Sequence, residues 1–216
     1  MAERAALTAF CLPALIRSTC LRQAQNGTSM LEVLVSIFIM TLGLLGMAAM
    51  QVRAQQAELE SYQRSQGLIL ANGMVDRINV NRKAAGCYNF TTKTTTGAPY
   101  AGTGAASAPL CGPFGTSETR ARADTDMSEW HDTLKGSAEQ LGAIQVGAMI
   151  GARGCVSSDT TVTPNVYRVS VAWQGQVKSR NPTTADAAYT CGTGLYGSDE
   201  SLRRVVSVTF PIASLK

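Results

Sequence analysis

The chain has 216 residues, a formal net charge of +4 and 16% charged residues. This length suits one ordinary domain together with a membrane anchor. The small net charge gives no support for nucleic acid as a partner. The short basic pairs Arg82-Lys83 and Arg203-Arg204 are predicted to lie on solvated faces.

A membrane-length apolar run follows a basic N-terminal segment. No charged residue occurs from Val33 to Val52, and about 20 helical residues, rising about 1.5 Å each, cross the ~30 Å hydrocarbon core. Arg17 and Arg22 precede the run, and basic flanks stay in the cytoplasm. We therefore expect residues 1–27 to be cytoplasmic and the chain beyond about residue 53 to be periplasmic. A secretory signal peptide fits less well, because its apolar region would be too long.

Glu32 is a single acidic residue at the start of this run, the fifth residue after Gly27. A carboxylate at the edge of a membrane segment is costly unless it has a partner. The alternative is an ordinary single-pass anchor whose interfacial carboxylate reaches water. That alternative explains the hydrophobicity but leaves the Gly27 junction as a coincidence.

The helical pattern continues beyond the apolar run. Leu68, Ala71, Val75 and Ile78 follow a spacing of three and four residues, which predicts an amphipathic seam. We expect one helix from about Ser29 to Arg82, apolar all round in its first half, with Gly86-Cys87 marking its end.

The middle of the chain predicts a loop and a short helix. Residues 91–117 are rich in Thr, Gly, Ala, Ser and Pro, which indicates a long irregular loop. Asp126 and Glu129 form a pattern like a capping box. This predicts a helix from about Met127 to Leu134 with Trp130 on its core face.

Two strands are indicated in the C-terminal part, at residues 166–173 and 203–212. Apolar residues alternate with polar or smaller ones in both, which is typical of half-buried strands. We expect one sheet face to pack on the long helix and the other to stay solvated. Residues 141–150 are a candidate for a further strand, and residues 178–201 are predicted to form a second long loop.

Six cysteines occur, and the first two, Cys11 and Cys20, precede the Gly27 junction. The other four are Cys87, Cys111, Cys155 and Cys191. Four cysteines in an exported domain favour two disulfides over free thiols. Of the three possible pairings we favour Cys87–Cys111 and Cys155–Cys191, on nearest-neighbour closure alone. Without a CxxC motif, and with one His, neither a metal site nor another cofactor is expected.

An enzyme is a poor interpretation of this sequence. His131 lies beside Asp132, with Ser128 three residues earlier. Three residues on one short helix cannot provide the geometry of a catalytic triad. Neither GxSxG nor HExxH occurs, so we expect no catalytic residues.

The segment from Gly27 to Glu32, with the apolar helix after it, resembles the prepilin peptidase site of the type IV pilin superfamily. Four segments, together a minor part of the chain, resemble minor pilins of the PilV class. The similarity lies in Leu31–Val35, Gly43–Gln51, Ala71–Arg82 and Tyr167–Gly175.

The resemblance implies an α+β type IV pilin fold, in which the long helix packs on a C-terminal antiparallel sheet. It implies a leader (1–27), a transmembrane half-helix (28–52), an amphipathic half-helix (53–86) and a globular head (87–216). A prepilin peptidase would cut between Gly27 and Thr28 and methylate the Thr28 amine. Glu32 would pair with that amine in a neighbouring subunit.

The implied function is that of a minor pilin that primes type IV pilus assembly. Such a subunit sits at or near the tip and supports twitching motility and adhesion. The implied partners are other minor pilins, the major pilin, a tip adhesin, and inner-membrane lipid before assembly. The implied locations are the inner membrane and the extracellular pilus. The alternative is a minor pseudopilin of a type II secretion system.

Overall fold

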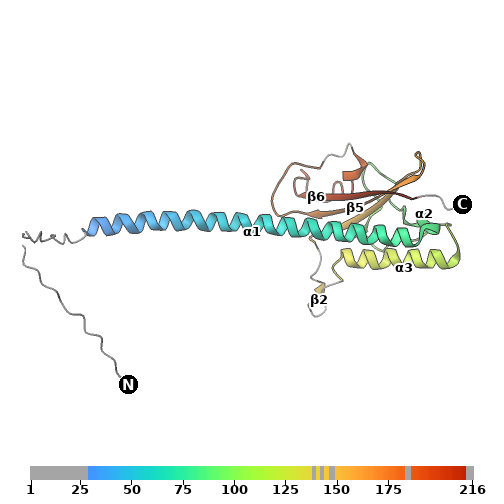
Figure 1. Cartoon of the computed structure of the whole chain (residues 1–216), viewed down its shortest axis with the longest axis horizontal. Coiled ribbons are helices and arrows are strands. Elements are labelled where there is room, and N and C mark those ends of the chain that lie inside the picture. Colours follow the sequence, from blue (N-terminus) through green and yellow to red (C-terminus); the bar gives the residue numbers. More distant parts are fainter. Residues whose placement is uncertain (1–28, 138–139, 142–143, 146–148, 183–185, 213–216) are drawn as a thin grey trace, which may run out of the picture. The chain divides into compact units, whose positions relative to one another are not determined.

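The computed structural model describes residues 29–137, 140–141, 144–145, 149–182 and 186–212. It divides into two units, Met1–Ala48 and Ala49–Lys216. Helix α1 (Met30–Val80) begins in the first unit and ends in the second. The second unit carries the four-stranded antiparallel sheet and helix α3 (Figure 1). The fold is α+β and consistent with a type IV pilin, as predicted.

The second half of α1 packs its buried seam against the sheet. The seam consists of Gly67, Ala71, Met74 and Ile78, spaced by four, three and four residues as one helical face requires. The predicted seam was partly wrong, since Leu68 is 37% exposed. Gly67 lies where a Cβ would come within 3.0 Å of the Trp173 ring. Because glycine has no Cβ, the sheet can approach α1 closely at this point.

The long helix ends close to its predicted boundary. Its last residue is Val80, and a 3₁₀ turn (Arg82–Ala84) and the short helix α2 (Ala85–Tyr88) follow. These turns carry the chain round the end of α1 to a mostly irregular segment. That segment includes the two-residue strand β1 (Ala101–Gly102).

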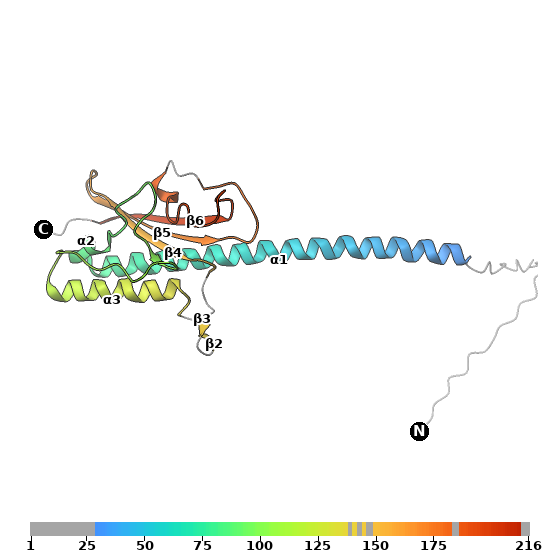
Figure 2. The ribbon, with the colours of Figure 1, turned by 180° about the vertical axis from the view of Figure 1, so that it is seen from behind.

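Helix α3 (Ser117–Leu134) begins ten residues before the predicted start. Its capping box is formed by Thr116 and Thr119, so the predicted cap at Asp126 and Glu129 is wrong. The core positions Met127, Trp130 and Leu134 are buried as predicted. Figures 1 and 2 show α3 alongside the second half of α1, and the Trp130 indole donates to the Leu70 carbonyl at 3.0 Å.

The sheet has the order β1-β4-β5-β6, with every neighbouring pair antiparallel. Strands β5 (Asn165–Gln174) and β6 (Arg203–Ile212) agree with the prediction. Strand β4 (Arg153–Asp159) was not predicted. In place of one strand at 141–150 the structure has a small hairpin of β2 (Gln140–Leu141) and β3 (Ile144–Gln145). Residues 142–143 and 146–148 lie outside the described residues.

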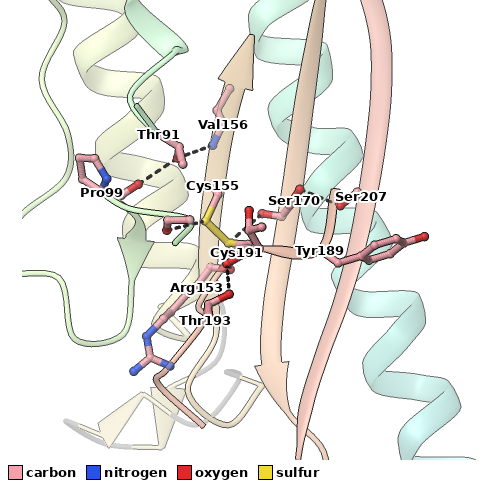
Figure 3. The surroundings of a disulfide bond; sticks show 12 residues. Thr91, Pro99, Arg153, Cys155, Val156, Ser170, Tyr189, Cys191, Thr193 and Ser207 are labelled. Carbon is pink, nitrogen blue, oxygen red and sulfur yellow. Dashed lines mark hydrogen bonds between the residues drawn. A yellow bond between two sulfur atoms is a disulfide. The ribbon is translucent and has the colours of Figure 1, made fainter. Parts of the chain in front are cut away.

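The sheet face away from α1 is covered, contrary to the prediction that it stays solvated. Ser170 and Ala172 of β5 are 3% and 0% exposed. The segment between β5 and β6, including the 3₁₀ turn Ala187–Tyr189, folds over them. The Ser170 and Ser207 hydroxyls are hydrogen bonded at 2.7 Å (Figure 3). The Ser207 hydroxyl donates to the Ala188 carbonyl, so Ser170 is the donor to Ser207. This cover buries a second, smaller cluster with Cys155 and Tyr196.

Two disulfides join the four cysteines of the second unit, pairing Cys87 with Cys111 and Cys155 with Cys191. The second disulfide links β4 to the covering segment (Figure 3). Cys191 is 1% exposed. The pairing is the one that nearest-neighbour closure favoured.

Replacing Cys155 and Cys191 together by Ala is expected to lower the free energy of unfolding by about 4 kcal/mol. The disulfide closes a loop of 36 residues, and loop-closure entropy for that length has about this magnitude. Urea unfolding of the full chain in detergent micelles, followed by tryptophan fluorescence, measures the difference. Equal stability of the variant and the oxidised parent would contradict a disulfide at this place.

Arg203 is buried, so the prediction of a solvated Arg203-Arg204 pair is wrong for this residue. Its side chain is 1% exposed and forms an ion pair with Glu200. The guanidinium also donates to the carbonyls of Tyr189 and Cys191. A buried guanidinium must have its donors satisfied, and here carbonyls of the covering segment satisfy them.

Candidate functional site

Glu32 lies in the first turn of α1, three residues after Ser29, which caps the helix. The Ser29 hydroxyl accepts from the Leu31 amide at 3.2 Å, and the Ser29 carbonyl accepts from the Glu32 amide at 2.9 Å. A negative side chain in the first turn interacts favourably with the helix dipole. The Glu32 side chain is exposed, and none of the ion pairs among the described residues includes it.

The helix that follows Glu32 is apolar and exposed all round. Its large apolar side chains from Met30 to Val52 are 46% to 89% exposed. Helix α1 is long and apolar enough to cross a membrane. Burying one such side chain contributes about 1.5–3 kcal/mol, so this half of α1 requires an apolar environment outside its own chain. Lipid and the apolar helices of other subunits are two such environments.

Two of the predicted site residues cannot be placed. Gly27 and Thr28 lie outside the described residues, so the cleavage position and the methylated amine remain predictions. The described helix begins at Met30. Near its start the Ser36 hydroxyl donates to the Glu32 carbonyl at 2.7 Å, so this hydroxyl is satisfied within the helix.

The buried carboxylate of Asp126, which the sequence pattern indicated as a helix cap, instead joins α1, α2 and α3. Asp126 is 1% exposed and accepts from the Tyr88 hydroxyl at 2.6 Å. Arg77 of α1 and Arg122 of α3 form ion pairs with it at 3.3 and 3.1 Å. Burial, and then the hydrogen bond to Asp126, raise the pKa of Tyr88. The phenol therefore remains a donor, and the cluster fixes the helices of the second unit.

His131 has a structural role in the same helix. It is 5% exposed, and its Nδ1 accepts from the Gly102 backbone amide at 3.0 Å. Burial, and then the charge of Lys135, lower its pKa, while Asp132 opposes the shift. Accepting at Nδ1 requires neutral imidazole. The side chain thus links α3 to β1, which is inconsistent with a general base facing a substrate.

Stability is expected to fall as the pH drops from 7.5 to 5.5. The pKa of His131 is lower in the folded chain than the usual value of about 6.5, so the unfolded chain binds the extra proton. The stability contribution is present above pH ~6.5 and decreases below it by up to about 1.4 kcal/mol per pH unit. Urea unfolding at several pH values measures this slope.

The His131→Gln variant provides the control for this prediction. It should be less stable at pH 7.5 but lose the slope between pH 7.5 and 5.5. Because the chain has one His, the assignment is direct. An unchanged slope in the variant would show that other groups cause the effect.

Comparison with known proteins agrees with the fold. Residues 49–130 match a family model described as "Tt1218-like: Type IV pilin Tt1218". The match covers less than half of the chain. No curated protein and no solved structure matches.

The match and the N-terminal motif are independent observations. The matched segment begins at residue 49, after Gly27, Glu32 and most of the apolar run. It ends at residue 130, before β4, β5 and β6. Together with the α+β fold, the match supports the type IV pilin superfamily and a pilin subunit.

Proposed function

We propose that this protein is a minor pilin of the PilV class that primes assembly of a type IV pilus. It is incorporated at or near the pilus tip with other minor pilins and a tip adhesin, ahead of the major pilin. Pilus formation, twitching motility and adhesion depend on it. The observation that carries this proposal is Glu32 in the first turn of an exposed apolar helix.

Processing sets up the assembly step. Prepilin peptidase cuts after Gly27, which leaves Thr28 with a new ammonium group that the enzyme methylates. The leader (1–27) stays on the cytoplasmic side. Residues 28–52 form the transmembrane half of the helix, residues 53–86 its amphipathic half, and residues 87–216 the periplasmic head. The head leaves the cell surface as part of the pilus.

Glu32 then sets the axial register between subunits. In a filament core of low dielectric, an unpaired carboxylate costs several kcal/mol, whereas attraction to an ammonium falls off with distance. A subunit that leaves the bilayer is stable only where its Glu32 side chain forms an ion pair with the N-terminal amine of a neighbouring processed subunit. The exposed apolar residues of α1 pack against neighbouring helices in that position.

Deletion of the gene, with complementation, tests the proposed function. A minor pilin predicts a loss of surface pili and of twitching, with secretion of extracellular enzymes intact. The chain itself should be found in fibres sheared from the complemented cells. Loss of secretion with intact pili would instead identify a type II pseudopilin.

A further inference from the structure

A cavity of the second unit opens on the sheet where the covering segment ends. Its volume is about 470 Å³, and small-molecule sites usually have volumes of about 300–1,000 Å³. Ala187 of the 3₁₀ turn in the covering segment forms part of its wall. The lining residues on which its chemistry depends are Thr94, Ser157, Asp159, Val166 and Arg168.

The strand register places polar side chains of β4 and β5 together on one face of the sheet. Arg168 pairs with Ser157, and the side chains of directly opposite residues project to the same side. Tyr167 and Val169, the neighbours of Arg168 in β5, belong to the core that faces α1. Arg168 therefore lies on the other face, in line with Ser170. Ser170 is buried under the covering segment, whereas Arg168 is half-buried, so the cover ends beside Arg168.

The Arg168 guanidinium has no partner among the described residues. No ion pair and no hydrogen bond between them includes it, and its Nε atom is buried without an acceptor. By contrast, Arg77, Arg203 and Arg204 each pair with a carboxylate. Because the donors of a half-buried arginine normally have acceptors, the cavity offers Arg168 to an acceptor from outside the chain.

Asp159 adds a carboxylate to the same cavity. Its Oδ1 accepts from the Thr161 amide at 2.9 Å and from the Thr161 hydroxyl at 2.6 Å. These bonds, and to a smaller extent the charge of Arg168, lower the pKa of Asp159. The carboxylate is therefore ionised at neutral pH, and its Oδ2 accepts nothing from the part of the chain that the structure describes. The hydroxyls of Thr94 and Ser157 form no hydrogen bond there either.

These groups together favour a ligand that carries both a carboxylate and hydroxyls. A guanidinium binds a carboxylate through two parallel N–H groups. The Asp159 carboxylate and the Ser157 hydroxyl suit hydroxyls of the ligand. A doubly charged phosphate would be repelled by Asp159, and a carboxylate without hydroxyls would leave Asp159 and Ser157 without partners. A uronic-acid ring carries one carboxylate and several hydroxyls, and its C–H face suits Val166.

We propose that this cavity binds a uronic-acid unit of an acidic polysaccharide. Arg168 donates to the carboxylate of the sugar, Asp159 and Ser157 bond its hydroxyls, and Val166 contacts its apolar face. The access of a polysaccharide to the cavity rests on the proposed function, which carries the head out of the cell. Binding there gives the head an adhesive role of its own, in addition to its role in assembly.

Saturation-transfer difference NMR of the full chain in detergent micelles tests this site. The probe is trigalacturonate, and its methyl ester is the matched control, because the ester keeps the rings and their hydroxyls without the charge. Trigalacturonate should bind saturably, and the ester at least about tenfold more weakly. Triglutamate, which has the same net charge but no hydroxyls, should also bind at least about tenfold more weakly than trigalacturonate.

Matched variants assign the binding to this cavity. Arg168→Gln should raise the Kd for trigalacturonate at least about tenfold, because it removes a charge-assisted contact. Arg168→Lys keeps the charge without the planar guanidinium and should give an intermediate Kd. Ser157→Ala should raise the Kd about threefold to tenfold. Arg82→Gln changes an exposed arginine outside the cavity and should have no effect. Matching urea midpoints show that each variant is folded.

Four outcomes would overturn the proposal. The first is the absence of saturable trigalacturonate binding. The second is equal binding of the methyl ester, which would show that the carboxylate is not recognised. The third is equal binding of triglutamate, which would indicate an acidic peptide as the ligand. The fourth is an unchanged Kd in a folded Arg168→Gln variant, which would place the binding elsewhere on the chain.

This test is separate from the proposed function, because the micelles contain no pilus. A chain that binds trigalacturonate, but whose deletion leaves pili and twitching intact, would contradict the pilin role and retain the site. A chain that is required for pili and does not bind trigalacturonate would contradict the site alone.

Discussion

Replacing Glu32 with Ala is expected to leave leader removal intact but to lower the amount of the chain in sheared pili at least tenfold. In the proposed assembly, the variant loses the carboxylate that would pair with a neighbour's amine, and the unpaired ammonium would then cost several kcal/mol in the filament core. A loss of 1.4 kcal/mol already gives a tenfold effect. Quantitative immunoblots of sheared pili and of membranes measure the distribution.

Two further variants isolate the charge of Glu32. Glu32→Gln keeps nearly the same shape and should fail like Ala, whereas Glu32→Asp keeps the charge and should retain part of the incorporation. Glu58→Ala is the matched control, because Glu58 is an exposed carboxylate of the same helix and lies beyond the span. Normal incorporation of Glu32→Ala would refute the role of this residue in assembly.

Replacing Gly27 with Leu is expected to leave the precursor uncut. The resemblance places Gly27 directly before the cut, where a residue without a Cβ lets the peptidase approach the backbone closely. Electrophoresis should show a single band that is larger by the mass of residues 1–27. The chain should then remain in the membrane and be absent from pili.

Gly43→Leu is the control for the Gly27 variant. A Cβ at Gly43 would meet no heavy atom within 4 Å, and the residue lies inside the apolar span. This variant should be cut normally, whatever its effect on assembly. Normal cutting of Gly27→Leu would show that the site lies elsewhere.

The parts of the fold that depend on simple periodicity were predictable. Strands β5 and β6 alternate apolar residues, and the predicted apolar positions Val169 and Val206 are buried in the core. The length of α1 followed from the absence of proline and the apolar run. These signals are local, so one sequence is enough to find them.

Other parts depend on contacts that no local pattern encodes. Strand β4 has a glycine where Trp130 packs, and a Cβ at Gly154 would lie 2.1 Å from that ring. Strand β4 therefore lacks the alternation of apolar and polar residues that would have predicted it. The first turns of α3 carry mostly polar residues, so their helical period is hidden. The cover over Ser170 and Ala172 comes from a loop that is distant in sequence.

The candidate sites differ in the same way. Glu32 and Gly27 form a short linear motif, which a sequence can show. The sequence left three possible pairings of the four cysteines, and only the structure distinguishes the nearest-neighbour pairing from the other two. The contacts of Asp126 could not be predicted, because they join α1 and α2 to α3 through residues 38 and 49 positions earlier in the chain.

Mass spectrometry of the mature N-terminus from sheared pili tests the central claim most directly. The account predicts a chain that begins at Thr28, carries a methyl group on its amine, and is present in the fibres. A chain that begins at Met1 and occurs only in the cytoplasmic membrane would contradict it.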